Sequence, residues 1–138
     1  MSMRLFIGDR RSEAGVDAVL AEGRGIAYGD GVFETMRAVD GAIPWWPAHR
    51  ARLASGAARF GIPLPPGPYL DAELHDWLSQ HRDAVIKLIV TRGSGGRGYA
   101  PISGAPPVWM LMASALPAPM RPVGLTLRWC ETRLSLQP

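Results

Sequence analysis

The segment Gly31-Val32-Phe33-Glu34-Thr35-Met36-Arg37-Ala38-Val39 alternates with a strict period of two. One set of alternate positions is Phe, Thr, Arg and Val, and the other is Val, Glu, Met and Ala, which is the pattern of a β-strand with two different faces. The pair Asp40-Gly41 follows and supplies the positive φ angles that a tight hairpin needs. We therefore predict a strand over residues 31–39 and a return strand over residues 42–46.

Two amphipathic helices are predicted downstream of this hairpin. Pro47 suits the first position of a helix, where its missing N–H is not needed, and Gly61 suits the end of that helix. A second helix is predicted to begin near Pro68, because apolar residues then recur at helical spacing as far as His81, which we expect to cap its end. Each helix needs an apolar surface to cover, and a sheet would provide it.

Further strands are predicted over residues 3–7, 84–92, 108–115 and 123–130, while residues 8–25 are predicted to form a loop. Strands first, two helices in the middle and strands again indicate an α+β fold. The expected architecture is a two-layer sandwich, in which two helices cover a mainly antiparallel sheet. The length of 138 residues suits one domain, and 47% apolar with 20% charged residues excludes a disordered chain or a membrane protein.

Net charge, histidine spacing and cysteine content limit which partners, metal sites and cellular location we expect. The net charge is +3, but the basic residues are scattered among acidic ones and form no stripe with stacking aromatics, so no nucleic-acid partner is expected. The three histidines have no ligand spacing with cysteine or acidic residues, so no metal site is expected. Cys130 is expected to be a small buried residue on a strand. With one cysteine and no signal peptide, the predicted location is the cytoplasm.

The run Gly93-Ser94-Gly95-Gly96-Arg97-Gly98 formally matches the dinucleotide-binding pattern G-x-G-x-x-G. That pattern requires a helix at its last glycine, which Pro101 and the prolines after it would prevent. The loop instead joins Arg92 and Arg97 with the phenol of Tyr99. Because arginine forks bind carboxylates in bidentate fashion, the loop is predicted to bind a carboxylate, with a solvated surface loop as the alternative.

Lys87 is the only lysine among the 15 basic residues, and it lies in an apolar predicted strand. Apolar neighbours would lower its pKa, which suits a Schiff base or a contact with an anion. The alternative is a lysine on an edge strand with its ammonium group in water.

Three motifs together resemble the class IV (fold-type IV) pyridoxal-phosphate enzymes: YGDGVFETMR at residues 28–37, HRARL at 49–53 and TRGSGGRGY at 91–99. That family includes branched-chain and D-amino-acid aminotransferases and 4-amino-4-deoxychorismate lyase. The third motif resembles the lyase most closely, whereas Phe33-Glu34-Thr35 is more like the aminotransferases.

The resemblance implies that residues 1–138 form the small N-terminal domain of such an enzyme. The Schiff-base lysine of the family would then lie in a C-terminal domain that this chain lacks, and the chain alone would be inactive. The implied cofactor is pyridoxal 5'-phosphate, and the implied partners are the chain's own C-terminal domain and a second copy in a homodimer. The resemblance assigns the cofactor phosphate to Arg52. Together with the loop analysis, it gives as candidate substrate-binding residues Tyr28, Lys87, Arg92, Arg97 and Tyr99.

The implied reaction is the elimination of pyruvate from 4-amino-4-deoxychorismate to give 4-aminobenzoate for folate biosynthesis. A class IV aminotransferase is the first alternative. A non-enzymatic domain that binds anions is the second.

Overall fold

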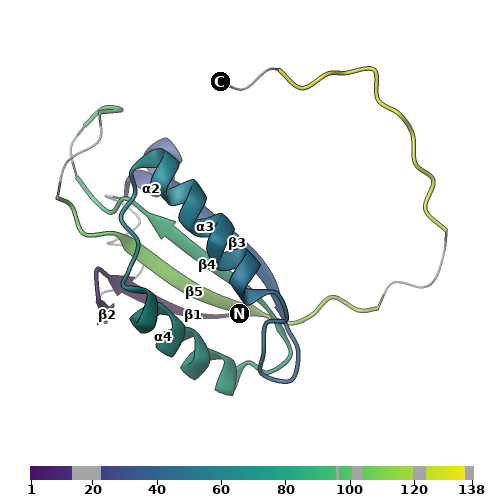
Figure 1. Ribbon diagram of the computed structural model, residues 1–138, viewed down its shortest axis with the longest axis horizontal. Helices are drawn as coiled ribbons and strands as arrows, with labels where there is room; N and C mark the ends of the chain where they lie inside the picture. The colour runs from purple at the N-terminus through teal and green to yellow at the C-terminus, as the bar shows by residue number, and fades with distance from the viewer. Residues whose placement is uncertain (14–22, 96, 101–103, 120–123, 136–138) are drawn as a thin grey trace.

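The computed structural model describes residues 1–13, 23–95, 97–100, 104–119 and 124–135. In this part of the chain, five antiparallel strands form one sheet in the order β2-β1-β5-β4-β3, with helices packed against it (Figure 1). The elements, in chain order, are β1 Ser2–Ile7, β2 Arg10–Ser12, α2 Arg24–Tyr28, β3 Gly31–Ala38, α3 Trp46–Phe60, α4 Gly67–Gln80, β4 Ala84–Thr91 and β5 Val108–Ser114.

The alternating segment forms a strand, as predicted; this strand is β3, at one edge of the sheet. It pairs with β4 along its whole length, from Gly31 opposite Thr91 to Ala38 opposite Ala84. Glu34, Met36 and Ala38 are buried, whereas the residues between them are exposed. One face of the strand is therefore covered and the other is open, which the sequence alternation predicted.

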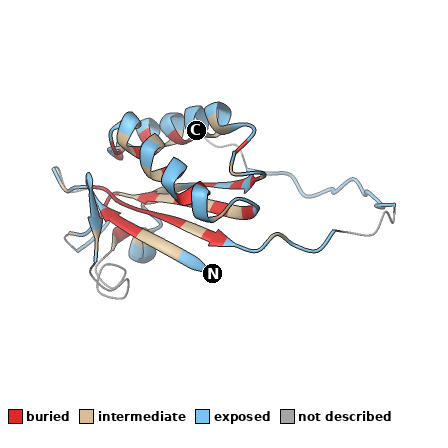
Figure 2. Ribbon diagram, turned by 90° about the horizontal axis from the view of Figure 1, so that it is seen from below, coloured by how far each residue is buried: buried red, intermediate tan, exposed pale blue. Residues whose placement is uncertain are grey.

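Helices α3 and α4 cover one face of the sheet, which confirms the two-layer α+β fold (Figure 2). Leu53 and Ala57 of α3 and the buried leucines of α4 pack on the strands. In this core, the rings of Phe6 on β1 and Trp109 on β5 stack with their centroids 3.7 Å apart. Gly61 ends α3 with a φ of 61°, and His81 occupies the C-cap position of α4, as predicted.

The opposite face of the sheet carries a smaller apolar cluster, centred on Leu5, Val108 and Met110. A cavity of about 480 Å³ lies beside it, next to α2. Methionines dominate its wall, at positions 1, 3, 110 and 112. Within the described ranges, no helix is long and apolar enough to cross a membrane, and no three His, Cys, Asp or Glu side chains are grouped for a metal ion.

The predicted return strand over 42–46 is wrong. Asp40 and Gly41 do adopt positive φ angles, but only a single bridge joins Val39 to Ala42 before the chain turns into α3. Pro44 lacks the N–H that a ladder needs, and this stops the pairing. Trp46 instead begins the helix, and its indole donates to Asp71 of α4 over 3.0 Å.

The predicted strand over 123–130 is also wrong for residues 124–130, which are exposed and unpaired with the sheet; Val123 lies outside the described residues. Both sides of β5 are already paired, with β1 and with β4, so the last predicted strand finds no partner there. Cys130 is consequently exposed rather than buried. Conversely, the segment predicted as loop, residues 8–25, holds β2 and the first two residues of α2. Neither is long enough to show a periodic pattern.

Candidate functional site

Glu34 is a buried carboxylate, 2% exposed, on the helix-covered face of β3. His49 and Arg52 stand one turn apart on α3, so both side chains reach it. His49 Nδ1 lies 2.7 Å from Glu34 Oε2, and Arg52 donates from Nε to Oε1 over 2.7 Å and from Nη2 to Oε2. Burial raises the pKa of Glu34, but the hydrogen bonds from Arg52 and His49 outweigh it and hold that pKa below its ordinary value. The carboxylate is therefore ionised and fixes both side chains.

Arg52 is held on one side and open on the other. Its Nε and Nη2 face Glu34, the described part of the chain offers Nη1 no hydrogen-bond partner, and the side chain is 69% exposed. The pairing with Glu34 raises the pKa of Arg52, so the guanidinium stays charged. A charged fork whose outer edge meets solvent has the chemistry to hold a phosphate, which fits the cofactor-binding role predicted for Arg52.

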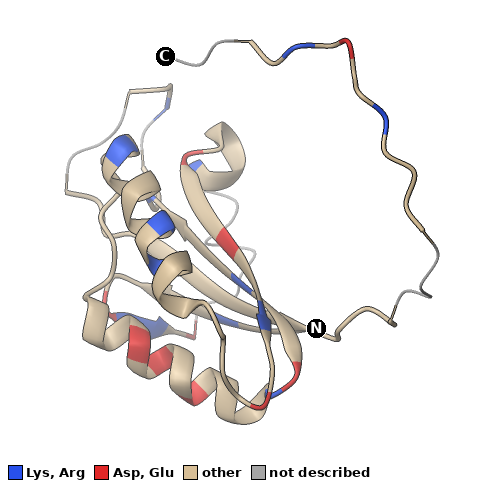
Figure 3. Ribbon diagram, turned by 45° about the vertical axis from the view of Figure 1, so that its right-hand side comes forward, with Lys and Arg blue, Asp and Glu red and all other residues tan. Residues whose placement is uncertain are grey.

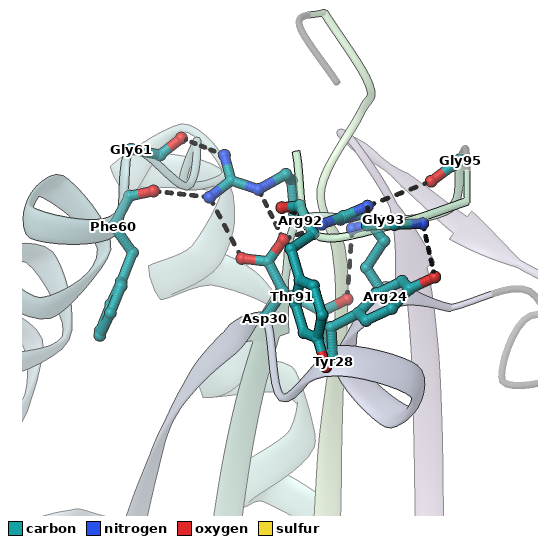
Figure 4. Close-up of polar contacts among 11 residues, drawn as sticks. Arg24, Tyr28, Asp30, Phe60, Gly61, Thr91, Arg92, Gly93 and Gly95 are labelled. Carbon is teal, nitrogen blue, oxygen red and sulfur yellow. Dashed lines mark hydrogen bonds and ion pairs between the residues drawn. The ribbon is translucent and has the colours of Figure 1, made fainter. Parts of the chain in front are cut away.

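Arg92 is used inside the fold. Its Nε and Nη2 donate to the two carboxylate oxygens of Asp30, over 2.8 and 3.1 Å, while Nη1 and Nη2 donate to the carbonyls of Gly61 and Phe60, over 2.8 and 2.6 Å. All three guanidinium nitrogens thus bind either Asp30, which directly precedes β3, or the end of α3 (Figure 4). These contacts assign Arg92 a structural task, and the substrate contact predicted for it stays a prediction.

Arg24 is a site residue that sequence reasoning missed. It begins α2, is 3% exposed, and donates from Nε to Asp30 over 2.8 Å. Its other nitrogens point to the loop after β4, at the carbonyls of Gly95, Gly98 and Tyr99. A buried arginine requires hydrogen-bond acceptors. The acidic residue Asp30, six residues further along the chain, is the sequence signal that could have indicated a buried partner for Arg24. The loop carbonyls, 71 to 75 residues away, leave no such signal.

The loop brings two predicted residues together. The Gly98 amide donates to the Tyr28 hydroxyl over 3.0 Å, and the rings of Tyr28 and Tyr99 meet edge to face at 5.3 Å. Tyr99 is 86% exposed, and Arg97 is exposed beside it. Arg97 has no hydrogen bond or ion pair with the residues that the structure describes. The side chains at the tip of this loop therefore face solvent, while its backbone is bound to α2.

Lys87 lies apart from these groups, on the open face of the sheet. Its Nζ stands 4.8 Å from the ring centroid of Phe33, and its strand partners are Thr35 of β3 and Met112 of β5. Because β4 lies between β5 and β3, the edge-strand alternative is wrong. Figure 3 shows the other basic residues spread over several elements rather than gathered in one stripe. Within the described ranges, no contact joins Lys87 to Arg52 or to Arg97.

A family model, known protein sequences and solved structures that match this chain all indicate one family. The family model described as amino-transferase class IV matches residues 31–138. An aminodeoxychorismate lyase from Vibrio harveyi is 35% identical over 119 residues, which covers 83% of this chain and 44% of that protein. A D-alanine aminotransferase from Bacillus licheniformis is 35% identical over 111 residues, covering 76% of this chain and 38% of that protein.

A solved structure with the same fold is that of 4-amino-4-deoxychorismate lyase from Pseudomonas aeruginosa. It has a TM-score of 0.70 and 40% sequence identity, over 84% of this chain and 41% of that one. The chain thus spans less than half the length of each of these relatives.

Proposed function

The chain belongs to the class IV aminotransferase family, whose members are pyridoxal-phosphate enzymes, and from this premise we propose that it forms the N-terminal part of an aminodeoxychorismate lyase. The proposed reaction removes pyruvate from 4-amino-4-deoxychorismate and leaves 4-aminobenzoate, a precursor for folate biosynthesis. We place the enzyme in the cytoplasm as a homodimer. The Schiff-base lysine belongs, in this proposal, to a second domain.

The observation that carries the proposal is the loop of residues 93–95 and 97–99. The loop carries the exposed guanidinium of Arg97 and the exposed phenol of Tyr99. Its backbone is hydrogen-bonded to side chains of helix α2. The substrate of the lyase bears two carboxylates, which are the groups that an arginine fork binds best. The similarity to lyases from two organisms supports the same choice.

Arg52 is the residue of this chain that would hold the cofactor phosphate. Glu34 fixes one edge of its guanidinium, and the other edge is free to donate to phosphate oxygens. When bound, pyridoxal phosphate supplies an electron sink for the elimination. In this proposal Lys87 lines the substrate pocket and does not form the Schiff base; its ammonium group lies 4.8 Å from the centroid of the Phe33 ring.

An aminotransferase remains the second candidate, favoured by the similarity to D-alanine aminotransferase and by Phe33-Glu34-Thr35 in the first motif. One assay separates the candidates. The protein encoded by the complete gene, loaded with pyridoxal phosphate, should release pyruvate from aminodeoxychorismate with no keto acid present. Exchange of an amino group between an amino acid and a keto acid, without pyruvate release, would instead identify an aminotransferase. Anion binding with neither activity would leave only the non-enzymatic reading.

A further inference from the structure

We propose that Arg24 is a positioning residue that sets where the loop of residues 93–95 and 97–99 presents Arg97 and Tyr99, and that Asp30 couples this placement to helix α3. Nothing in the sequence motifs assigns a role to Arg24. Because the loop is the proposed carboxylate-binding element, the inference rests on the proposed function and adds to it the residue that organises the site.

Arg24 binds the loop at several points. Its backbone N–H donates to the Gly93 carbonyl over 3.0 Å, Nη1 donates to Gly98 over 3.1 Å with a longer 3.5 Å contact to Gly95, and Nη2 donates to Tyr99 over 3.1 Å. Hydrogen bonds from a charged donor are about twice as strong as neutral ones. One buried guanidinium therefore holds both ends of the loop tip.

The loop needs such an anchor because its backbone is glycine-rich. Gly93, Gly95 and Gly98 have φ angles of 90°, 142° and 92°, a region that glycine enters freely and leaves freely. Fixing each of these residues in one conformation costs backbone conformational entropy. If Arg24 already orders the loop in the free protein, a ligand that binds Arg97 loses less free energy to ordering the loop.

Asp30 links Arg24 to a second part of the site. Its Oδ2 accepts from Nε of Arg24 and from Nε of Arg92, each over 2.8 Å, and Arg92 reaches on to the carbonyls of Phe60 and Gly61 at the end of α3 (Figure 4). Cations are favourable at the C-terminus of a helix. Helix α3 also carries Arg52. The network therefore connects the loop proposed for the substrate carboxylate with the helix proposed for the cofactor phosphate.

The side chains of this network do not touch the side chain of Arg97, so Arg24 acts through the backbone of the loop. Its loss should weaken substrate binding more than it slows the chemical step. General destabilisation predicts a different result, namely less folded enzyme with an unchanged KM. The split between KM and kcat thus distinguishes a positioning role from a merely structural one.

The test is Arg24→Lys in the full-length protein, with Arg10→Lys as the matched control, since Arg10 is exposed on β2 and outside the network. Lysine keeps the charge but lacks the fork that spans Asp30 and the loop carbonyls. We expect KM for aminodeoxychorismate to rise about tenfold or more, as the loss of two charged hydrogen bonds implies, while kcat stays within about threefold. An unchanged KM would overturn the proposal. If Arg24→Lys does not fold, Asp30→Asn should produce the same split.

Hydrogen exchange provides a readout that needs no activity. The Gly98 amide donates to Tyr28 only while the loop lies on α2. Its exchange should be faster in Arg24→Lys than in Arg10→Lys by about tenfold or more. Equal exchange in the two variants would overturn the anchor. If the wild-type protein releases no pyruvate, the proposed function fails, and the exchange measurement still decides the role of Arg24.

Discussion

Glu34 and Arg52 form an ion pair in which a fully buried carboxylate holds one edge of a largely exposed guanidinium. The carboxylate is 2% exposed and the arginine side chain 69%. The pair joins the edge strand β3 to helix α3, and it leaves the outer edge of the arginine facing solvent. The buried partner thus orients a cation that remains available to a ligand.

Replacing Glu34 with glutamine should weaken both the fold and the proposed phosphate site. The amide keeps the shape but loses the charge, so His49 and Arg52 lose charge-assisted bonds, at a cost of roughly 1–3 kcal/mol in the free energy of unfolding. Urea unfolding measures this loss. The Kd for pyridoxal phosphate should rise several-fold, as spectroscopic titration would detect. Glu131→Gln is the control, because Glu131 is exposed, and equal effects in both variants would contradict the role of Glu34.

Stability should fall in acid because of Asp30. The hydrogen bond from Arg92, aided by Arg24, holds the pKa of Asp30 below its ordinary value. The folded state therefore binds fewer protons than the unfolded state, so this contribution is complete above about pH 5 and is lost as the pH falls through the lowered pKa. Unfolding free energies measured between about pH 2 and 6 should depend less steeply on pH in Asp30→Asn. Identical slopes for the variant and the wild type would argue against the ion pairs.

Arg97→Ala in the full-length protein should raise KM for aminodeoxychorismate by about tenfold or more, since a charged pair with a carboxylate is lost. Because Arg97 is exposed and has no hydrogen bond or ion pair with the described residues, the unfolding free energy should change by less than about 0.5 kcal/mol. Steady-state kinetics and urea unfolding together check both parts. A variant with the wild-type KM would remove Arg97 from the carboxylate site.

Gly93→Ala should destabilise the loop where it leaves β4. A Cβ there would clash with the backbone oxygen of Pro106, at a φ of +90° that L-residues rarely adopt. The free energy of unfolding, measured with urea, should fall by about 1–3 kcal/mol. Gly124→Ala is the matched control, because a Cβ at Gly124 meets nothing within 4 Å. A loss in the control as large as in Gly93→Ala would contradict this explanation.

Lys87 should not form a covalent adduct with the cofactor in the 138-residue chain. Lys87 lies on the interior strand β4, and its ammonium group lies over the Phe33 ring, 4.8 Å from the ring centroid. Borohydride treatment after incubation with pyridoxal phosphate, followed by peptide mass mapping, checks this. A stoichiometric pyridoxyl group on Lys87 would show that this lysine is the reactive one.

The sequence alone determined the layers of the fold. The alternation over residues 31–38, the helix signals at Pro47 and Gly61, and the aliphatic run of β4 are local patterns that follow from burying one face of each element. These predictions are confirmed. The failures at 42–46 and 124–130 concern pairing between strands: Pro44 removes an N–H that a ladder with β3 needs, and β5 is already paired on both sides.

The motifs also gave Arg52, Arg97 and Tyr99 as candidate site residues. Only the tertiary structure decided how the arginines divide: Arg52 and Arg97 face solvent, whereas Arg24 and Arg92 are buried around Asp30. The physical reason is that a buried cation is defined by acceptors that the fold brings to it. The acceptors of Arg24 and Arg92 lie up to 75 residues away in the chain, and contacts over such distances leave no periodic trace in the sequence.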